Sequence, residues 1–300
     1  MAADTAPARV LVLGLGYAGR HLATLLQAHG IACSGTVRDP AIAPADGVPR
    51  HRLAEGNPLE AALHEAIRTA DAILCSVPPD AGGDPALRLL GKALHDAPSL
   101  RWVGYLSSTA VYADRDGGWI DTHSTADATD DTALRRLRAE QQWQAFAQAR
   151  GIASAVFRLP ALYGRGRNAL VQLAHGKARQ VVRPGQVFNR LHAEDLATAV
   201  LAAMRRPQAD ALYLPADDEP APPQDVLAHA AALSDLPLPA PQAWDDPAVP
   251  ASLRRFYGSN KRIDSRGTRE ALQWQPRFPT YREGLADAWA AGDGTITTIR

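Results

Sequence analysis

Short aliphatic runs alternate with longer amphipathic segments over the first 160 residues of the chain. Five runs predict buried strands, because they are rich in leucine and β-branched residues and end at glycine or polar residues. The predicted strands are 9–14, 31–37, 71–77, 100–106 and 153–159. Apolar residues recur at helical spacing between them, over 17–29, 58–68, 85–95 and 132–150. Strands that alternate with helices predict an α/β fold, a parallel sheet covered on both faces.

The character of the sequence changes after Pro160, where the segments become shorter. Residues 215–250 contain nine prolines, which favour loops and short helices over a continuing sheet. A helix is predicted at 192–204, since its apolar side chains form one stripe. We therefore expect two parts, residues 1–160 and a smaller, mixed part at 161–300. A strand and helix at about 185–205 return from the second part to pack on the first.

The sequence GLGYAG has the spacing G-x-G-x-x-G where the first predicted strand ends and the first helix begins. Here the first glycine permits a tight turn, and the second lets backbone N–H groups approach a pyrophosphate. The third lets the helix lie close to the strand. The motif therefore predicts a dinucleotide-binding protein. Its candidate cofactor-binding residues are Gly14, Gly16, Tyr17, Ala18 and Gly19.

The end of the second predicted strand indicates which dinucleotide binds. A carboxylate normally holds the ribose 2′-hydroxyl there, but the expected position is Val37, followed by Arg38. Arginine supplies a forked cation for a 2′-phosphate, so the sequence predicts NADP(H) as the preferred cofactor. In the alternative, Asp39 holds the ribose of NAD(H) and Arg38 faces solvent.

Composition and charge exclude several classes of partner. The formal net charge is zero, which argues against a nucleic-acid or anionic-membrane partner, because both select basic surfaces. No apolar run approaches the ~18 residues of a membrane helix. The first residues have no apolar signal core, so we expect a cytoplasmic protein. The nine histidines show no metal-binding spacing, and no metal site is expected.

Several further motifs follow in the order found in one enzyme family. After the glycine loop come SVPP (76–79), SSTAVY (107–112) and RLPALYGRGR (158–167), and then GQVFNRLHAEDLA, NKRI and LQWQP. In these motifs the chain resembles an extended short-chain dehydrogenase/reductase of the NAD-dependent epimerase/dehydratase type, and it is most similar to the YeeZ-like subgroup. The resemblance implies a seven-stranded, doubly wound Rossmann sheet as an NAD(P)-binding core, a small C-terminal substrate subdomain and a homodimer.

The resemblance also implies roles for residues at the ends of the strands. Ser108, three places before the valine of VY, is implied to hold the reacting oxygen of the substrate. Pro160 matches the position beside the nicotinamide. Ser76, Val77 and Pro78 match the segment that passes the pyrophosphate and ribose of the cofactor.

The chain departs from the family at its acid/base pair, a Tyr followed four residues later by a Lys on the helix after VY. Aligning the usual glutamate of that helix on Glu140 places Thr132 at the Tyr position and Arg136 at the Lys position. An aliphatic hydroxyl gives up a proton much less readily than a phenol. Arginine stays protonated, so Arg136 is expected to contact the cofactor without moving a proton.

Three explanations remain for the missing pair. Another residue acts as acid/base, with Tyr112, Tyr163 and Asp114 as candidates, although Tyr112 and Tyr163 also fit structural roles. Alternatively, the reaction needs only hydride transfer and takes a proton from water. In the third explanation, the protein binds a dinucleotide and catalyses nothing.

Four residues of the second part are candidates for contact with the substrate. Arg165, Arg167 and Arg190 fit an anionic substrate such as the pyrophosphate of a nucleotide sugar, or surface positions. His192 fits the substrate cleft, or a helix start. We predict an NAD(P)(H)-dependent oxidoreductase or epimerase acting on a sugar, nucleotide sugar or similar small molecule. The alternative is a non-catalytic NADP(H)-binding redox sensor.

Overall fold

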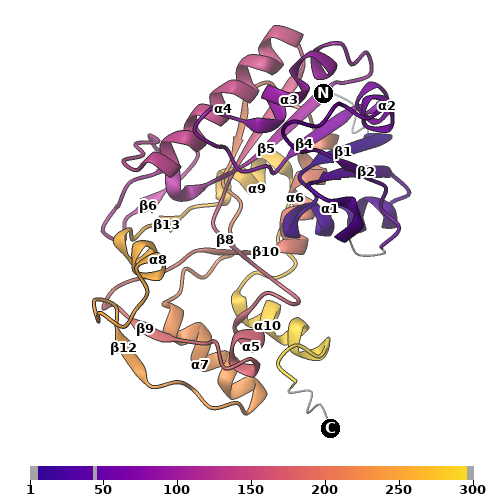
Figure 1. The fold of residues 1–300 in the computed structure, drawn as a ribbon. Coiled ribbons are helices and arrows are strands. Elements are labelled where there is room, and N and C mark those ends of the chain that lie inside the picture. Colours follow the sequence, from indigo (N-terminus) through magenta and orange to yellow (C-terminus); the bar gives the residue numbers. More distant parts are fainter. Residues whose placement is uncertain (1–5, 43–45, 296–300) are drawn as a thin grey trace.

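The computed structural model describes residues 6–42 and 46–295. Seven parallel strands form the central sheet in the order β11-β7-β5-β4-β1-β2-β3, so the chain winds outward from β1 in both directions (Figure 1). The strands are β1 Arg9–Leu13, β2 Ala32–Val37, β3 Arg50–Arg52, β4 Ala72–Cys75, β5 Trp102–Ser108, β7 Ala153–Leu159 and β11 Ala211–Tyr213. This is the doubly wound Rossmann sheet expected from the alternating pattern, and ligands bind such sheets at the carboxyl ends of the strands.

Helices cover both faces of this sheet. They are α1 Tyr17–Ala28, α2 Ala61–Thr69, α3 Pro85–His95, α4 Asp131–Arg150 and α6 Ala193–Arg205. Successive strand residues point to opposite faces. Val10 and Val12 of β1 therefore pack with α1 and α6, whereas Leu11 and Leu13 pack with α2, α3 and α4. Because both faces are buried, the central strands are apolar along their whole length.

The predicted strands and helices of the first part lie within a few residues of their observed positions. The pattern did not predict β3 and β11. Each has three residues, and β3 reads Arg-His-Arg, which carries no apolar signal. Helix α6 covers the residues expected to return and packs against α1.

A smaller part lies below the sheet in Figure 1 and is built around one apolar cluster. Its main helices are α5 Ala169–Ala174, α7 Pro223–Ser234 and α10 Tyr281–Ala290. The strands β8 (Ala161–Tyr163) and β10 (Arg190–His192) pair in parallel between the two parts, so the predicted returning strand joins β8 and not the central sheet. The remaining elements are β6 Trp119–Ile120, β9 Gln180–Val182, β12 Pro241–Ala243, β13 Arg262–Ile263, α8 Ala251–Arg254, α9 Arg266–Leu272, η1 Pro40–Ile42, η2 Thr109–Val111 and η3 Arg255–Gly258.

A buried ion pair holds α4 on the sheet. Glu140 of α4 accepts hydrogen bonds from the guanidinium of Arg158 on β7, with the closest atoms 2.7 Å apart. Ser107 of β5 donates to the same carboxylate, and Arg158 also donates to the Tyr112 hydroxyl at 2.9 Å. The Glu140–Arg158 pair therefore joins a helix, two neighbouring strands and Tyr112, which ends the turn η2 after β5.

Removal of one member of this pair leaves the other charge buried without a partner. We predict that Glu140→Gln lowers the free energy of unfolding by ~3–5 kcal/mol. The double variant Glu140→Leu/Arg158→Met is expected to lose less, because neither charge remains. Urea denaturation measures both changes, with Glu65→Gln at an exposed pair as the control. A Glu140→Gln protein as stable as the wild type would contradict this role for the pair.

Candidate active site

The glycine loop after β1 is locked between the ends of two other strands. Gly14 has a φ of +87°, in the left-handed region that favours glycine. Its N–H donates to Thr36 Oγ1 at 2.9 Å, and its carbonyl accepts from Ser76 Oγ at 2.5 Å. A Cβ at Gly14 would lie 2.9 Å from Ser76 Oγ and 3.2 Å from Val77. Ser76 and Val77 thus lie against the loop, and Pro78 beyond them is exposed.

The other two glycines of the loop have different reasons to lack a side chain. A Cβ at Gly19 would lie 2.9 Å from Val12 Cγ1, so glycine lets α1 pack closely on β1. A Cβ at Gly16 would meet nothing within 4 Å, and no side chain caps this end of α1. The space beside Gly16 is therefore open and adjoins free N–H groups at the positive end of a helix. It fits a dinucleotide pyrophosphate, held by the first backbone N–H groups of α1.

Two arginines stand where β2 and β3 end. Arg38 is exposed directly after β2, and Arg52 pairs with Val37 in the register of the two strands. Asp39 accepts from the backbone N–H of Ala41 at 3.0 Å and lies 3.6 Å from the Arg52 guanidinium. The Asp39 carboxylate is thus engaged by its own turn and by β3, while Arg38 faces solvent.

Ser107 and Ser108 point to opposite sides at the end of β5 because side chains alternate along a strand. Ser107 is buried and bound to Glu140, so it supports the wall from behind. Ser108 is half-buried, and its Oγ accepts from the backbone N–H of Ala110 at 3.2 Å as the cap of η2. Of the two serines, Ser108 is therefore the one placed to contact a ligand, as the resemblance implies.

Two further predicted cofactor-binding residues, Arg136 and Pro160, lie at this edge of the sheet. Thr109 Oγ1 donates at 3.3 Å to the carbonyl of Leu159, the residue directly before Pro160. Arg136 of α4 is half-buried and donates to a backbone carbonyl of β5 at 3.4 Å. Arg136 and Pro160 thus lie at the same end of the sheet as Ser108, where a nicotinamide and its ribose would bind.

Thr132 is exposed in the first turn of α4, one turn before Arg136. Its backbone N–H donates to the capping residue Asp130 at 2.9 Å. A threonine side chain lacks the length of a tyrosine ring as well as its acidity. Thr132 therefore does not supply the proton transfer that the family assigns to this position.

Tyr112 is 1% exposed, and its hydroxyl accepts from Arg158 at 2.9 Å. Burial raises the pKa of this phenol above its usual value. The ring packs against the Arg158 guanidinium, which is itself bound to Glu140. This placement gives Tyr112 a structural role and corrects the catalytic one considered from the sequence.

The other two alternative acid/base residues are also engaged. The Tyr163 hydroxyl donates to the carbonyl of Thr280 at 3.1 Å, and burial raises its pKa well above the usual range. Asp114 accepts from the backbone N–H of Asn260 at 2.6 Å, a hydrogen bond that lowers its pKa. Tyr163 therefore holds β8 to the segment before α10, Asp114 joins the turn after η2 to the segment before β13, and neither is poised to exchange a proton.

Two of the predicted substrate arginines have other partners. Arg165 is half exposed and binds Asp287 through hydrogen bonds of 2.9 and 3.1 Å. The Arg167 guanidinium lies 5.1 Å from the ring centroid of Tyr17, the first residue of α1. Arg167 thus lies beside the glycine loop, where the cofactor is expected to bind.

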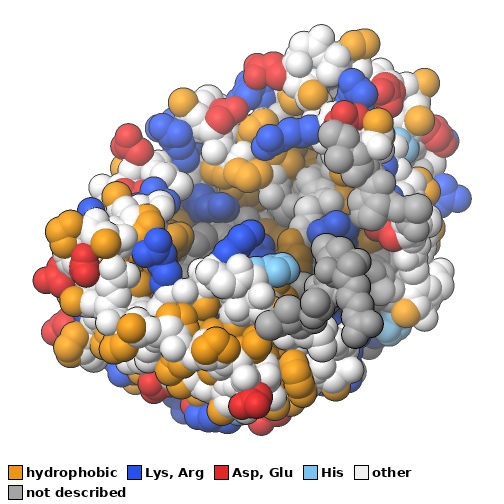
Figure 2. All heavy atoms as spheres, turned by 60° about the horizontal axis from the view of Figure 1, so that its bottom comes forward, with side chains coloured by type: hydrophobic (Ala, Val, Ile, Leu, Met, Phe, Trp, Pro, Cys, Tyr) orange, Lys and Arg blue, Asp and Glu red, His pale blue; other side chains and the backbone are white. Residues whose placement is uncertain are grey.

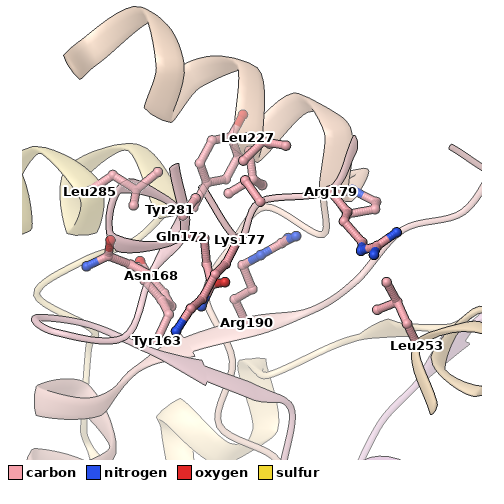
Figure 3. Close-up of a pocket in the computed structure, with 14 residues that line it drawn as sticks. Tyr163, Asn168, Gln172, Lys177, Arg179, Arg190, Leu227, Leu253, Tyr281 and Leu285 are labelled. Carbon is pink, nitrogen blue, oxygen red and sulfur yellow. The ribbon is translucent and has the colours of Figure 1, made fainter. Parts of the chain in front are cut away.

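Arg190 lines a cavity of about 410 Å³ in the smaller part (Figure 3). Lys177 and Arg179 reach the same cavity from the connection between α5 and β9, while Leu227 and Tyr281 supply an apolar wall from α7 and α10. Burial lowers the pKa of the Arg190 guanidinium, although it stays far above neutral pH. Three cations beside an apolar wall fit an organic anion.

Asp217 lies next to Arg190 but does not neutralise it at neutral pH. Its backbone N–H donates to the Arg190 carbonyl at 2.8 Å, and its side chain is 3% exposed. Neither carboxyl oxygen has a hydrogen-bond partner in the described chain, and burial raises the pKa to about 8. Below that pH the carboxyl is neutral and leaves the charge of Arg190 available to a ligand.

His192 is fully buried, which corrects its predicted contact with a substrate. Its Nδ1 accepts from the backbone N–H of Glu194 at 3.3 Å, so His192 caps α6, the alternative considered from the sequence. Burial lowers the pKa of its imidazole to about 4. The side chain is therefore neutral and belongs to the start of the helix.

Lys261 is a buried cation near Ser108 that the sequence did not single out. Its Nζ donates to the carbonyl of Tyr112 at 2.7 Å and lies 3.4 Å from the carbonyl of Thr109. The composition could have drawn attention to Lys261, because only three of the 32 Lys and Arg residues in the chain are lysines. Lysine, unlike arginine, readily releases a proton when it is buried.

Basic side chains gather where the molecule is hollowed. Figure 2 turns the smaller part toward the viewer and shows Lys and Arg side chains inside and around a hollow. The acidic side chains on this face lie mostly toward the outer edge of the molecule, away from the hollow. Such a distribution attracts anions even though the whole chain has no net charge.

The doubly wound sheet, the glycine loop and the Ser108 edge define a dinucleotide-binding protein of the short-chain dehydrogenase/reductase type. Residues 86–213 match the profile of the NAD dependent epimerase/dehydratase family. The chain belongs to this family; its resemblance to the family aligns Thr132 and Arg136 with the Tyr and Lys of the acid/base pair. A nicotinamide dinucleotide is the cofactor of this family of enzymes.

Known proteins resemble the chain over almost its full length. A conserved protein of unknown function from Silicibacter pomeroyi is 38% identical over 95% of this chain and 99% of its own, with a TM-score of 0.85. A Streptomyces protein described as 3-diazoavenalumate denitrifying reductase is 29% identical over 92% of this chain and 99% of its own. MoeE5, solved with UDP-glucose and NAD, is 21% identical over 94% of this chain and 98% of its own; its TM-score of 0.73 shows a shared fold.

The open space at Gly16 provides a test of the cofactor site. We predict that Gly16→Ala weakens NADPH binding by at least ~10-fold, because the methyl group enters the pyrophosphate space. The free energy of unfolding is expected to stay within ~1 kcal/mol of the wild type. Gly19→Ala is the control, since its Cβ meets Val12 and destabilises the fold by ~1–3 kcal/mol. Fluorescence titration and urea denaturation measure the two effects, and unchanged NADPH affinity in Gly16→Ala would contradict the assignment.

Proposed function

We propose that the protein is an NADPH-dependent reductase that transfers hydride to an electrophilic carbon of a small organic anion. The bound nicotinamide supplies the hydride. Ser108 orients the reacting end of the substrate, Arg136 binds the cofactor ribose, and the Lys177–Arg179–Arg190 cavity holds the anionic end. The observation that carries this proposal is the cluster of three cations on one cavity, which β8 connects to Pro160.

The position of the cavity supports an elongated substrate. β8 begins directly after Pro160 and ends at Tyr163, which lines the cavity. At ~3.3 Å per residue, the cavity begins roughly 10 Å from the position beside the nicotinamide. A substrate with its reacting carbon at Ser108 and its charge at Arg190 must bridge this distance.

The ligands named for two similar proteins have this chemistry in common. MoeE5 binds UDP-glucose, and the Streptomyces relative is described as acting on 3-diazoavenalumate. Both names denote anions. For this chain we infer only that the substrate is an organic anion, and we infer neither of these two compounds.

Reduction suits the residues present better than epimerisation does. An epimerase of this type first oxidises a hydroxyl, so a base must remove a proton before the carbonyl is reduced again. Thr132 and Arg136 do not provide that base. A reductase needs hydride and, for a carbonyl acceptor, one proton. The description of the Streptomyces relative as a reductase supports the same choice.

We expect NADPH to bind at least ~10-fold more tightly than NADH, because the exposed fork of Arg38 pairs with a 2′-phosphate. Arg38→Gln is expected to remove this difference by weakening NADPH binding alone. Arg68→Gln, on an exposed face of α2, is the control. Isothermal titration of each protein with both cofactors decides the point, and equal affinities in the wild type would refute the preference.

The cavity provides a kinetic test of the function, with 4′-acetylbiphenyl-4-carboxylate as a probe, because its two rings separate the ketone from the carboxylate by the required length. We predict that Lys177→Met and Arg179→Met each raise its KM by ~10-fold with kcat nearly unchanged, because both remove ground-state binding of the carboxylate. Lys92→Met, at a fully exposed site on α3, is the control. NADPH oxidation at 340 nm gives both constants. Unaltered KM values in both cavity variants would argue against this substrate site.

A redox sensor is the second candidate function, favoured by the replacement of the family's Tyr and Lys. Tight NADPH binding without any absorbance change at 340 nm, over a panel of anionic ketones and nucleotide sugars, would support the sensor over the reductase. Assembly as a homodimer and a cytoplasmic location stay predictions from the sequence. Over residues 6–42 and 46–295, no helix is both long and apolar enough to cross a membrane.

A further inference from the structure

We propose that Lys261 donates the proton that accompanies hydride transfer to a carbonyl, in place of the tyrosine that the family uses. This proposal rests on the reductase function proposed above. It assigns the missing acid to a residue outside α4, where the family carries its acid/base pair.

The Lys261 ammonium lies on the turn that directly follows Ser108. It donates to the Tyr112 carbonyl at 2.7 Å, and the Thr109 carbonyl lies 3.4 Å away, so it contacts both ends of η2. An ammonium has three N–H groups. With two directed at these carbonyls, one N–H remains for a ligand.

The backbone of Lys261 is fixed between the reacting edge and the cavity. Asn189 donates to the Lys261 carbonyl at 2.8 Å and accepts from the N–H of Ile263 at 2.8 Å. Asn189 directly precedes Arg190, which lines the cavity. Lys261 thus stands between the strand that carries Arg190 and the turn that carries Ser108. A substrate that extends from the cavity to Ser108 passes this point.

The surroundings of Lys261 make its ammonium a usable acid at neutral pH. The side chain is 9% exposed, and none of the ion pairs of the described residues includes it. The charged groups that face it are Asp114 and Arg115 after η2 and Asp127 before α4. Burial and the charge of Arg115 outweigh the two carboxylates and lower the pKa of Lys261 to about 8. A general acid is most effective when its pKa is close to the working pH.

The proton is required by some acceptors and not by others. In a ketone, the carbonyl π bond breaks as the carbon accepts hydride and the oxygen accepts a proton from Lys261 Nζ. The products are an alcohol and a neutral lysine, which regains its proton from water. In an arenediazonium ion, hydride replaces dinitrogen on the ring carbon, and the products are the arene and N₂. That second reaction consumes no proton.

Two matched acceptors therefore separate proton donation from hydride transfer. 4′-Acetylbiphenyl-4-carboxylate and 4′-carboxybiphenyl-4-diazonium share a biphenyl and a carboxylate, and Lys261→Arg keeps the charge but cannot release the proton. We expect this variant to lose at least ~100-fold in kcat with the ketone and to stay within ~3-fold of the wild type with the diazonium ion, after subtraction of the enzyme-free rate. Equal effects on both acceptors, or full activity with the ketone, would overturn the proposal.

The pH dependence gives a second kinetic readout. With the ketone, wild-type kcat is expected to fall as the pH rises through about 8, because Lys261 loses the proton it must donate. The diazonium reaction is expected to lack this decline, and so is the residual ketone reaction of Lys261→Arg. Lys92→Arg, which changes an exposed lysine, is expected to behave as the wild type. A wild-type ketone profile that stays flat through pH 8 would overturn the proposal.

Direct observation of the side chain tests the contact without turnover. The chain has three lysines, so labelling with ¹³Cε-lysine gives three signals, and Lys261→Arg identifies the one from Lys261. This signal is expected to shift when 4′-acetylbiphenyl-4-carboxylate is added to the NADP⁺-bound protein. No shift would overturn the assignment of Lys261. A shift in a wild type that reduces neither acceptor would support the contact and count against the proposed function.

Discussion

The buried ion pair between Glu140 and Arg158 sets the geometry of the edge at which the chemistry is placed. Charges taken out of water are stable only when their hydrogen-bonding capacity is met. Ser107 and Tyr112 complete that requirement here. Because Ser107 is held on the face of β5 that α4 covers, the side chain of the next residue must point to the opposite face. The orientation of Ser108 is thus determined by an interaction that never touches a substrate.

Features that depend on local sequence were predictable from the sequence. Strands buried on both faces must be apolar throughout, and the glycine loop needs small residues at fixed spacing, so both left a clear signal. The roles of single side chains depended on distant partners. Arg165 pairs with Asp287, which lies 122 residues away, and Lys261 binds a carbonyl 149 residues away. β3 was missed because its three residues have no apolar pattern.

The family's fold is kept in this chain while the source of its acid moves. In the usual arrangement the hydroxyl at the end of β5 and the acid on the helix that follows both come from the first part of the chain. Here the substrate-facing serine stays on β5, whereas the lysine comes from the segment before β13. The two are brought together by Asn189, which holds that segment beside β10. Chemistry at this edge therefore depends on how the two parts of the molecule are joined.

The path of the chain limits how such an enzyme can be recombined. After residue 160 the chain comes back to the sheet as α6 and β11, leaves it for α7, β12 and α8, and returns as α9 against α6. A single crossover at that boundary would remove the edge strand beside β7 and uncover the apolar face of α1. New substrate ranges are therefore more accessible through changes in the intervening loops than through exchange of the smaller part as a module.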